Sequence, residues 1–240
     1  MNGCGRKIGP YRCCTIVQGD CLPLMKLLPE KCIDVVITDP PYGVQRDKGF
    51  TGSRAFGGGR GVPIACRTFS GDWDKQRPSA VCFQQILRIG KLVLIFGGNF
   101  FADILPMSKH WIVWDKLNTM RTFGDCELIW TNSLRTSVKK YTVEWNGLVG
   151  KEASRDHPTQ KPLKLLVRLV EDYGSGIVFD PYAGSGTTLV AAKKLGRHFL
   201  GFELDEKYCK IARERVARTE PRPSMKKQGS NFEYFNVLED

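Results

Sequence analysis

The chain has 240 residues, of which 42% are hydrophobic and 25% are charged, and its formal net charge is +11. This composition is typical of a globular protein with room for one large α/β domain, and no stretch reaches the roughly 18 apolar residues of a membrane span. The excess of positive charge favours a polyanionic partner, most simply nucleic acid. No apolar segment follows the first charged residues, so no secretory signal is predicted and we expect a cytoplasmic protein.

The nine cysteines are expected to be reduced thiols. Their odd number and the lack of Cys-x-x-Cys pairs argue against a disulfide framework and against zinc. Cys13 and Cys14 are adjacent, and none of His110, His157 and His198 lies near a cysteine at ligand spacing. The sequence therefore predicts no metal site.

The first part of the chain contains two predicted strands and one helix. Residues 1–14 are expected to form a loose basic segment, and a short strand follows at Thr15–Val17. Leu22–Leu28 has helical character and is closed by Pro29. The apolar, β-branched stretch Cys32–Ile37 predicts a short buried strand.

A stiff turn with two hydrogen-bond acceptors follows that strand. In Thr38-Asp39-Pro40-Pro41-Tyr42-Gly43 each proline holds its φ at about −65° and lacks an N–H, so the turn cannot continue the sheet. The Asp39 carboxylate and the Pro40 carbonyl offer two acceptors side by side, and Tyr42 offers a flat face. This set suits a flat ring that carries an –NH2 group, although a surface turn with a chance Asp-Pro is the alternative.

Residues 43–77 are predicted to form a mobile basic loop. Glycines such as Gly52 and Gly57 are interleaved with basic residues such as Arg54 and Arg60, so the segment has little to bury. It is longer than a connector needs to be, which indicates either a function or a solvated linker.

Four elements and a second basic segment are expected in the middle of the chain. A helix over Ala80–Ile89 precedes a strand over Leu92–Phe96, and Trp111–Trp114 and Glu127–Thr131 are predicted to form a terminal antiparallel pair. Residues 132–156 mix basic and aromatic side chains, which suits a nucleic-acid surface, but half-buried strand edges have the same composition.

The last third of the chain predicts a β-α-β unit with a glycine-rich turn. A strand over Gly176–Phe179 leads into Asp180-Pro181-Tyr182-Ala183-Gly184-Ser185-Gly186-Thr187, and a helix and the strand His198–Glu203 follow. The glycines allow a ligand to approach the backbone, and Glu203 is placed to accept both hydroxyls of a ribose. Asp180 would repel a pyrophosphate but hold a cationic amino group. The turn therefore favours a nucleoside that carries an amino acid, which describes S-adenosylmethionine.

The two turns are expected to meet at one edge of an open parallel sheet. In such sheets ligands bind beyond the carboxyl ends of the strands, at the point where the strand order reverses. If the strands at 33–38 and 176–180 are neighbours, Asp39 and Asp180 lie on the same rim. One site would then hold the cofactor and the other the acceptor.

With these residues in hand, the chain resembles the amino-group DNA methyltransferases, which use S-adenosylmethionine. The resemblance covers roughly residues 15–218. Asp39-Pro40-Pro41-Tyr42 matches their catalytic motif, Asp180–Thr187 matches their cofactor loop, and His157-Pro158-Thr159-Gln160-Lys161-Pro162 matches a third motif beside the cofactor. The catalytic motif precedes the cofactor motif, as in the permuted beta group. The compact length is similar to that of phage- and prophage-encoded members, which implies a bacterial or phage-infected host.

The resemblance also implies an architecture and a set of site residues. The expected fold is Rossmann-like, with a mostly parallel seven-stranded sheet, helices on both faces and a circularly permuted motif order. One catalytic domain is expected over residues 1–220 with a tail at 221–240, loops 43–77 and 132–156 would recognise DNA, and a homodimer is an option. Asp20 would touch the adenine of the cofactor, and Thr159 or Lys161 would line its methionine end. The full implied cofactor set is Asp20, Asp39, Thr159, Lys161, Asp180, Pro181, Ala183, Gly184, Ser185, Gly186, Thr187 and Glu203.

The expected reaction is methyl transfer from S-adenosylmethionine to the N6 amine of an adenine flipped out of DNA. Asp39 and the Pro40 carbonyl would accept the two amino hydrogens and favour the tetrahedral nitrogen of the transition state, while Tyr42, which follows Pro41, stacks on the extruded ring. Asp at position 39 is the family's commoner choice for adenine. Cytosine N4 and RNA stay open as targets, and a nicotinamide oxidoreductase or a non-catalytic DNA-binding protein are the rival functions.

Overall fold

The computed structural model describes residues 5–43, 77–117, 124–144 and 160–222. In this part of the chain eight strands form one sheet in the order β3-β10-β9-β4-β5-β7-β6-β8, and β1 and β2 form a separate hairpin. The first five strands of that order run parallel, β7 runs antiparallel to both β5 and β6, and β8 runs parallel to β6. The sheet is therefore mixed but mainly parallel.

The bounds of the elements follow the chain from the hairpin to the last helix. The strands are β1 (Lys7–Ile8), β2 (Tyr11–Arg12), β3 (Thr15–Gln18), β4 (Ile33–Thr38), β5 (Gly90–Phe96), β6 (Trp111–Asp115), β7 (Cys126–Thr131), β8 (Lys139–Thr142), β9 (Ile177–Asp180) and β10 (His198–Glu203). The helices are α1 (Cys21–Lys26), α2 (Ala80–Ile89), α3 (Leu163–Tyr173), α4 (Thr187–Lys194) and α5 (Glu206–Arg218), with a short 3₁₀ helix at Gly98–Phe101.

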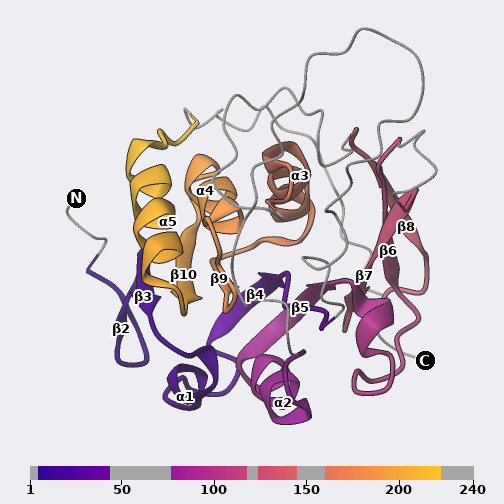
Figure 1. Ribbon diagram of the computed structural model, residues 1–240, viewed down its shortest axis with the longest axis horizontal. Coiled ribbons are helices and arrows are strands. Elements are labelled where there is room, and N and C mark those ends of the chain that lie inside the picture. The colour runs from indigo at the N-terminus through magenta and orange to yellow at the C-terminus, as the bar shows by residue number, and fades with distance from the viewer. Residues whose placement is uncertain (1–4, 44–76, 118–123, 145–159, 223–240) are drawn as a thin grey trace, which may run out of the picture.

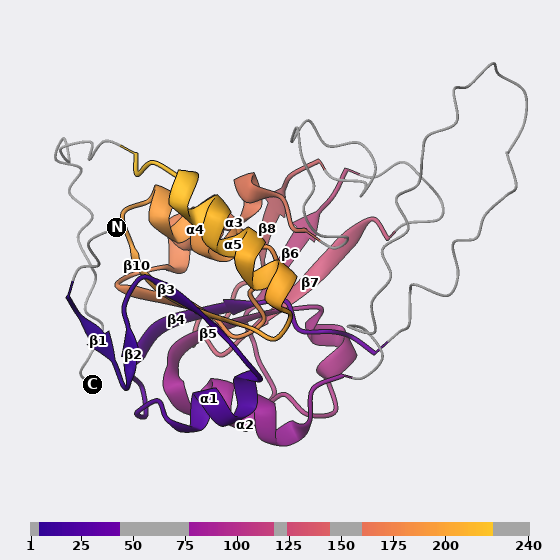
Figure 2. The same ribbon diagram turned by 60° about the vertical axis from the view of Figure 1, so that its left-hand side comes forward.

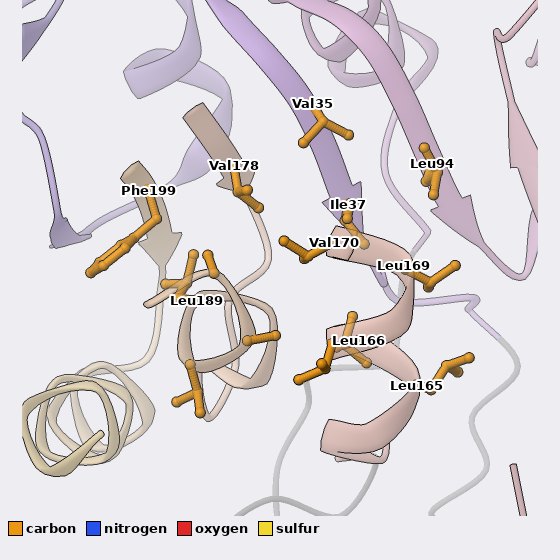
Figure 3. Close-up of a cluster of buried hydrophobic side chains, with 14 of the residues drawn as sticks. Val35, Ile37, Leu94, Leu165, Leu166, Leu169, Val170, Val178, Leu189 and Phe199 are labelled. Atoms are coloured by element: carbon orange, nitrogen blue, oxygen red, sulfur yellow. The ribbon is translucent and has the colours of Figure 1, made fainter. Parts of the chain in front are cut away.

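Helices cover both faces of the sheet. Helices α3, α4 and α5 lie on one side, and α1 and α2 lie on the other (Figures 1 and 2). From Val35 to Ile37 the side chains of β4 alternate between these two layers. Val35 and Ile37 join the core that includes Leu166 of α3 (Figure 3), whereas Ile33 and Val36 join the core on the opposite face. Burial on both faces explains why β4 is an almost unbroken apolar run.

Two segments contain strands that the sequence did not predict. Residues 5–14 are not a loose lead-in throughout, because β1 and β2 pair as a hairpin in which Ile8 faces Tyr11 and Ile8 is buried. Gly9, at φ +57°, provides the left-handed conformation that this tight turn needs. The second segment is β8, which raises the sheet from the expected seven strands to eight and places a further strand outside the β6–β7 pair.

Strand β8 occupies part of residues 132–156. Lys139, Lys140 and Thr142 are exposed while Tyr141 is buried, so this stretch is a half-buried edge strand that displays basic side chains. Residues 145–156 of that segment, most of the 43–77 loop and the tail from residue 223 lie outside the described residues. Among the helices of the described ranges, none is long and apolar enough to cross a membrane.

The expected meeting of the two turns is confirmed. Strands β4 and β9 are parallel neighbours, with Val35 opposite Val178 and Val36 opposite Phe179. Their carboxyl ends therefore lie at the same edge of the sheet. A hydrogen bond of 2.8 Å from Thr38 Oγ1 to Asp180 Oδ1 ties the two ends together.

Candidate functional site

The turn after β4 places Asp39 in a cluster of charged side chains. Tyr42 donates a hydrogen bond of 2.6 Å to Asp39 Oδ1, and Lys161 Nζ lies 2.7 Å from Asp39 Oδ2. The Asp39 side chain keeps 22% of its surface exposed, whereas that of Lys161 keeps 13%. Both oxygens of Asp39 thus have a partner, and the carboxylate is still within reach of a ligand.

Glu127 of β7 is a member of this cluster that the sequence did not predict. Its Oε1 lies 3.0 Å from Lys161 Nζ and 2.7 Å from the Tyr42 hydroxyl, and its Oε2 lies 3.0 Å from Lys116 Nζ. Two carboxylates therefore face two ammonium groups, so the cluster, which we call the Asp39 cluster, has no net formal charge. A glutamate within an apolar strand, Cys126–Thr131, is the one sequence signal that pointed to Glu127.

Burial and charge pairing oppose each other in the Asp39 cluster. Burial raises the pKa of Asp39 above its usual range, although Lys161 pulls it back. Burial acts on Glu127 as well, but Lys161 and Lys116 outweigh it and lower the pKa of Glu127 to about 2. Burial also opposes the charge of Lys161, yet Asp39 and Glu127 together raise the pKa of Lys161. Lys161 and Glu127 are accordingly ionised at neutral pH.

The ring of Tyr42 already has an aromatic neighbour. It stacks on Phe100 with ring centroids 4.6 Å apart and planes 15° apart. Gly97, at φ +63°, passes so close that a Cβ there would lie 2.4 Å from Cε1 of Tyr42, so only glycine fits. Phe100 therefore stacks on the ring that the sequence predicted would stack on an extruded base.

Asp180 is buried beneath the second turn rather than displayed in it. Its Oδ1 accepts hydrogen bonds from Thr38 Oγ1 at 2.8 Å and from the Tyr182 amide at 3.1 Å, and only 4% of the residue is exposed. Burial raises the pKa of Asp180 to about 7, against the opposing hydrogen bonds from Thr38 and Thr188. The Asp180 side chain thus connects the ends of β4 and β9.

The raised pKa of Asp180 gives a testable pH dependence of stability. Between about pH 4 and pH 7 the folded chain holds a proton on Asp180 that the unfolded chain has lost, so Asp180 lowers stability progressively as the pH rises through that window. Asp180→Asn removes this titration. We expect the melting temperature of the variant, relative to the wild type, to increase from about pH 5 to about pH 8 in thermal unfolding without ligand. A difference that does not change with pH would contradict the shifted pKa.

The acid at the end of β10 lies where the sequence placed it. Glu203 Oε2 accepts a hydrogen bond of 2.6 Å from the Gly184 amide, and Oε1 accepts one of 2.9 Å from the Asp205 amide. The Gly19 amide donates to the Glu203 carbonyl at 2.9 Å, which brings Asp20, the N-cap of α1, to the neighbouring strand end. Burial raises the pKa of Glu203, while the two amides oppose that shift.

The remaining residues of the glycine-rich turn are mostly buried, and Gly184 is partly exposed. Ser185 and Thr187 are buried, and Arg215 Nη1 donates to their hydroxyl oxygens at 2.8 and 3.1 Å. Gly186, at φ +80°, is required for packing, because a Cβ there would lie 2.8 Å from Cβ of Ala212 in α5. Pro181 and Ala183 are buried, whereas Gly184 is partly exposed.

The third motif connects the two turns. Lys161 contacts Asp39 and Glu127 at the first turn, whereas its neighbour Gln160 accepts a hydrogen bond of 3.2 Å from Ser185 Oγ at the second. Thr159 lies outside the described residues. The segment before α3 therefore joins the carboxyl ends of β4 and β9.

Comparisons with known proteins find similar DNA methylases. Residues 106–214 match the DNA methylase family model named for N6 and N4 methylation. The chain is 26% identical to the type II methyltransferase M.HinfI of Haemophilus influenzae, covering 88% of this chain and 70% of that protein. It is 27% identical to the putative methylase YubD of Escherichia coli (strain K12), and the match covers 91% of this chain and 96% of that protein. TTHA0409 of Thermus thermophilus, a putative DNA modification methylase solved in complex with S-adenosyl-L-methionine, shares the fold with a TM-score of 0.53. The two chains are 22% identical, and the match covers 86% of this chain and 94% of TTHA0409. Over these residues the chain is similar to the N6/N4 amino-group DNA methyltransferases.

Proposed function

We propose that this protein transfers a methyl group from S-adenosylmethionine to the N6 amine of adenine in DNA. The observation that carries the proposal is the common rim of the sheet. There the Asp39 turn and the glycine-rich turn lie at the ends of neighbouring strands and are joined by the Thr38–Asp180 hydrogen bond. An acceptor for an amino group and a turn suited to a nucleoside are thus side by side.

The chain's own residues fit this cofactor. Glu203 stands at the end of β10 and Asp20 lies just beyond the end of the adjacent β3, so two carboxylates flank the place where a ribose and an adenine would bind. The partly exposed Gly184 allows close approach to the backbone. When bound, S-adenosylmethionine would supply a methyl group on a positively charged sulfur.

The role of Asp39 follows from the chemistry of an exocyclic amine. The lone pair of that nitrogen is delocalised into the ring, so the nitrogen is a poor nucleophile. A carboxylate that accepts one amino hydrogen, with the Pro40 carbonyl accepting the other, favours the tetrahedral nitrogen of the transition state. As the N–CH3 bond forms and the S–CH3 bond breaks, one amino proton must leave, and Asp39 is the base that this turn offers to receive it.

The other side chains of the Asp39 cluster orient the Asp39 carboxylate before the target adenine binds. A carboxylate has about four lone-pair sites, so Asp39 can keep Tyr42 and Lys161 and still accept from an amino group. Lys161 and Tyr42 hold the carboxylate in one orientation, which removes reorganisation from the reaction step. Both are positioning residues in this proposal.

The adenine assignment rests on the aspartate at position 39, because the family includes both N6 and N4 enzymes. DNA is the proposed polymer, since the net charge is +11 and residues 132–144 add exposed basic side chains. The experiment is incubation of the purified chain with S-adenosylmethionine labelled on its methyl group and with duplex DNA or structured RNA of matched length. Label in the DNA supports the proposal, and label confined to RNA would refute it.

The cofactor half of the proposal can be tested by binding alone. Glu203→Gln exchanges a charge-assisted acceptor for a neutral one and is expected to weaken S-adenosylmethionine binding about tenfold in isothermal titration calorimetry. The matched control is Glu206→Gln in the exposed first turn of α5, which should leave the dissociation constant unchanged. An unchanged constant for Glu203→Gln would remove this carboxylate from the cofactor site.

A further inference from the structure

Two adjacent cysteines and a histidine from the other end of the sequence lie together beside the N-terminal hairpin. Cys13 Sγ is 3.2 Å from Nδ1 of His198, Cys14 Sγ is 3.9 Å from the same nitrogen, and the two sulfurs are 3.5 Å apart. All three side chains offer atoms that zinc prefers as ligands. Spacing along the sequence therefore does not exclude a metal here, because the fold brings distant ligands together.

The backbone brings both thiols to the same side. Neighbouring residues of an extended strand point to opposite faces, but Cys14 has φ +61°, a left-handed conformation that a non-glycine residue rarely adopts. The Cys14 amide donates a hydrogen bond of 2.7 Å to the carbonyl of Phe199, the residue after His198. The parallel pairing of β3 and β10 then continues from Thr15 opposite Leu200. The register of the sheet thus sets the position of the imidazole relative to the thiols.

The three donor atoms have the separations of a tetrahedral metal site. With Zn–S bonds of about 2.3 Å and Zn–N bonds of about 2.0 Å, a tetrahedral ion separates sulfur from nitrogen by roughly 3.6 Å and sulfur from sulfur by roughly 3.8 Å. The observed distances of 3.2, 3.9 and 3.5 Å scatter closely around these values. Cys13 is buried, whereas Cys14 and His198 are partly exposed, so an ion can reach the cluster from the surface.

We propose that Cys13, Cys14 and His198 bind one zinc ion. The site lies at the amino end of β10, whereas Glu203 lies at its other end, about 16 Å away along the strand, so the zinc site is separate from the reaction site. The ion would clamp the β1–β2 hairpin onto β10, beside the edge strand β3. Its role is structural, and its binding free energy adds to the stability of the fold.

The test is metal binding by the full chain after its metals have been removed with a chelator. Titration with Zn²⁺ against a chromophoric competitor is expected to show one tight equivalent per chain, and the melting temperature should rise with added Zn²⁺. Titration with Co²⁺ should give the intense visible bands of tetrahedral thiolate coordination. Cys13→Ser and His198→Gln are each expected to weaken zinc binding at least about a hundredfold, since changes to groups that merely support ligands already cost about ten- to a hundredfold.

The controls separate this site from the other thiols. Cys126→Ser removes an exposed cysteine away from the cluster and should leave zinc affinity unchanged. Cys14→Ser replaces a partly exposed thiol and provides a ligand variant if Cys13→Ser fails to fold. The proposal would be overturned if the wild type bound zinc no more tightly than His198→Gln. It would also be overturned if the Co²⁺ spectra lacked thiolate bands.

Discussion

Asp39→Asn is expected to lower the rate of methyl transfer at least about a hundredfold while the affinity for S-adenosylmethionine stays close to that of the wild type. The amide has nearly the same shape as the carboxylate but lacks its charge and presents donors as well as an acceptor. The amino nitrogen would lose stabilisation that grows as it becomes tetrahedral, and a lost transition-state partner usually costs this much. Lys161 would also lose one of its two anionic partners. Single-turnover kinetics and calorimetry measure the two quantities separately.

A matched control for Asp39→Asn stands on the same strand. Asp34 pairs with Lys91 at 2.7 Å and accepts a hydrogen bond of 2.7 Å from the Ile177 amide, near the amino end of β4. Asp34→Asn makes the same chemical change away from the reaction site, so its rate of transfer should match the wild type. If Asp39→Asn transferred methyl groups as fast as Asp34→Asn, the proposed role of Asp39 would be refuted.

Lys161→Met is expected to destabilise the fold by about 3 kcal/mol and to slow methyl transfer as well. Lys161 is the cation that the two carboxylates of the Asp39 cluster share, at 2.7 Å from Asp39 and 3.0 Å from Glu127, and only 13% of its side chain is exposed. Removing it leaves two nearly buried carboxylates without their shared cation, and breaking a buried pair typically costs about 3–5 kcal/mol. Chemical denaturation measures the loss.

Two further variants test whether the loss arises from charge. Lys91→Met breaks the pair with Asp34 in which the lysine side chain is 59% exposed, and such pairs contribute about 1 kcal/mol or less. Adding Asp39→Asn to Lys161→Met removes the carboxylate that has lost its cation and should restore part of the stability, whereas Glu127 keeps its pair with Lys116. Equal losses for Lys161→Met and Lys91→Met, or no recovery in the double variant, would show that the cluster does not stabilise the fold electrostatically.

The sequence predicted elements whose signal is local. Strand β10 has the predicted bounds, His198–Glu203, and the antiparallel pairing of β6 with β7 is confirmed, because apolar periodicity and glycine turns depend on neighbouring residues. The mainly parallel sheet with helices on both faces, which the resemblance implied, is also confirmed. The hairpin β1–β2 and strand β8 were missed because each is short and has few apolar residues to mark a buried face.

The contacts inside the site depend on pairings that no local pattern reveals. Glu127 meets Tyr42 across 85 residues of sequence, and His198 meets Cys13 across 185. Both contacts arise from strand order, which the sequence alone did not specify at these positions. Gly186 lies close to Ala212 of α5, a packing contact that the sequence did not predict because it depends on how α5 is placed.

The most direct test of the central claim is nucleoside mass spectrometry of duplex DNA incubated with the purified protein and S-adenosylmethionine bearing a deuterated methyl group. We predict labelled N6-methyldeoxyadenosine with the wild type and with Asp34→Asn, and a yield reduced at least about a hundredfold with Asp39→Asn. Labelled N4-methyldeoxycytidine would contradict the assignment of adenine while leaving the chemistry at Asp39 in place. Labelled 5-methyldeoxycytidine, or no labelled nucleoside with a protein that binds the cofactor, would contradict the account as a whole.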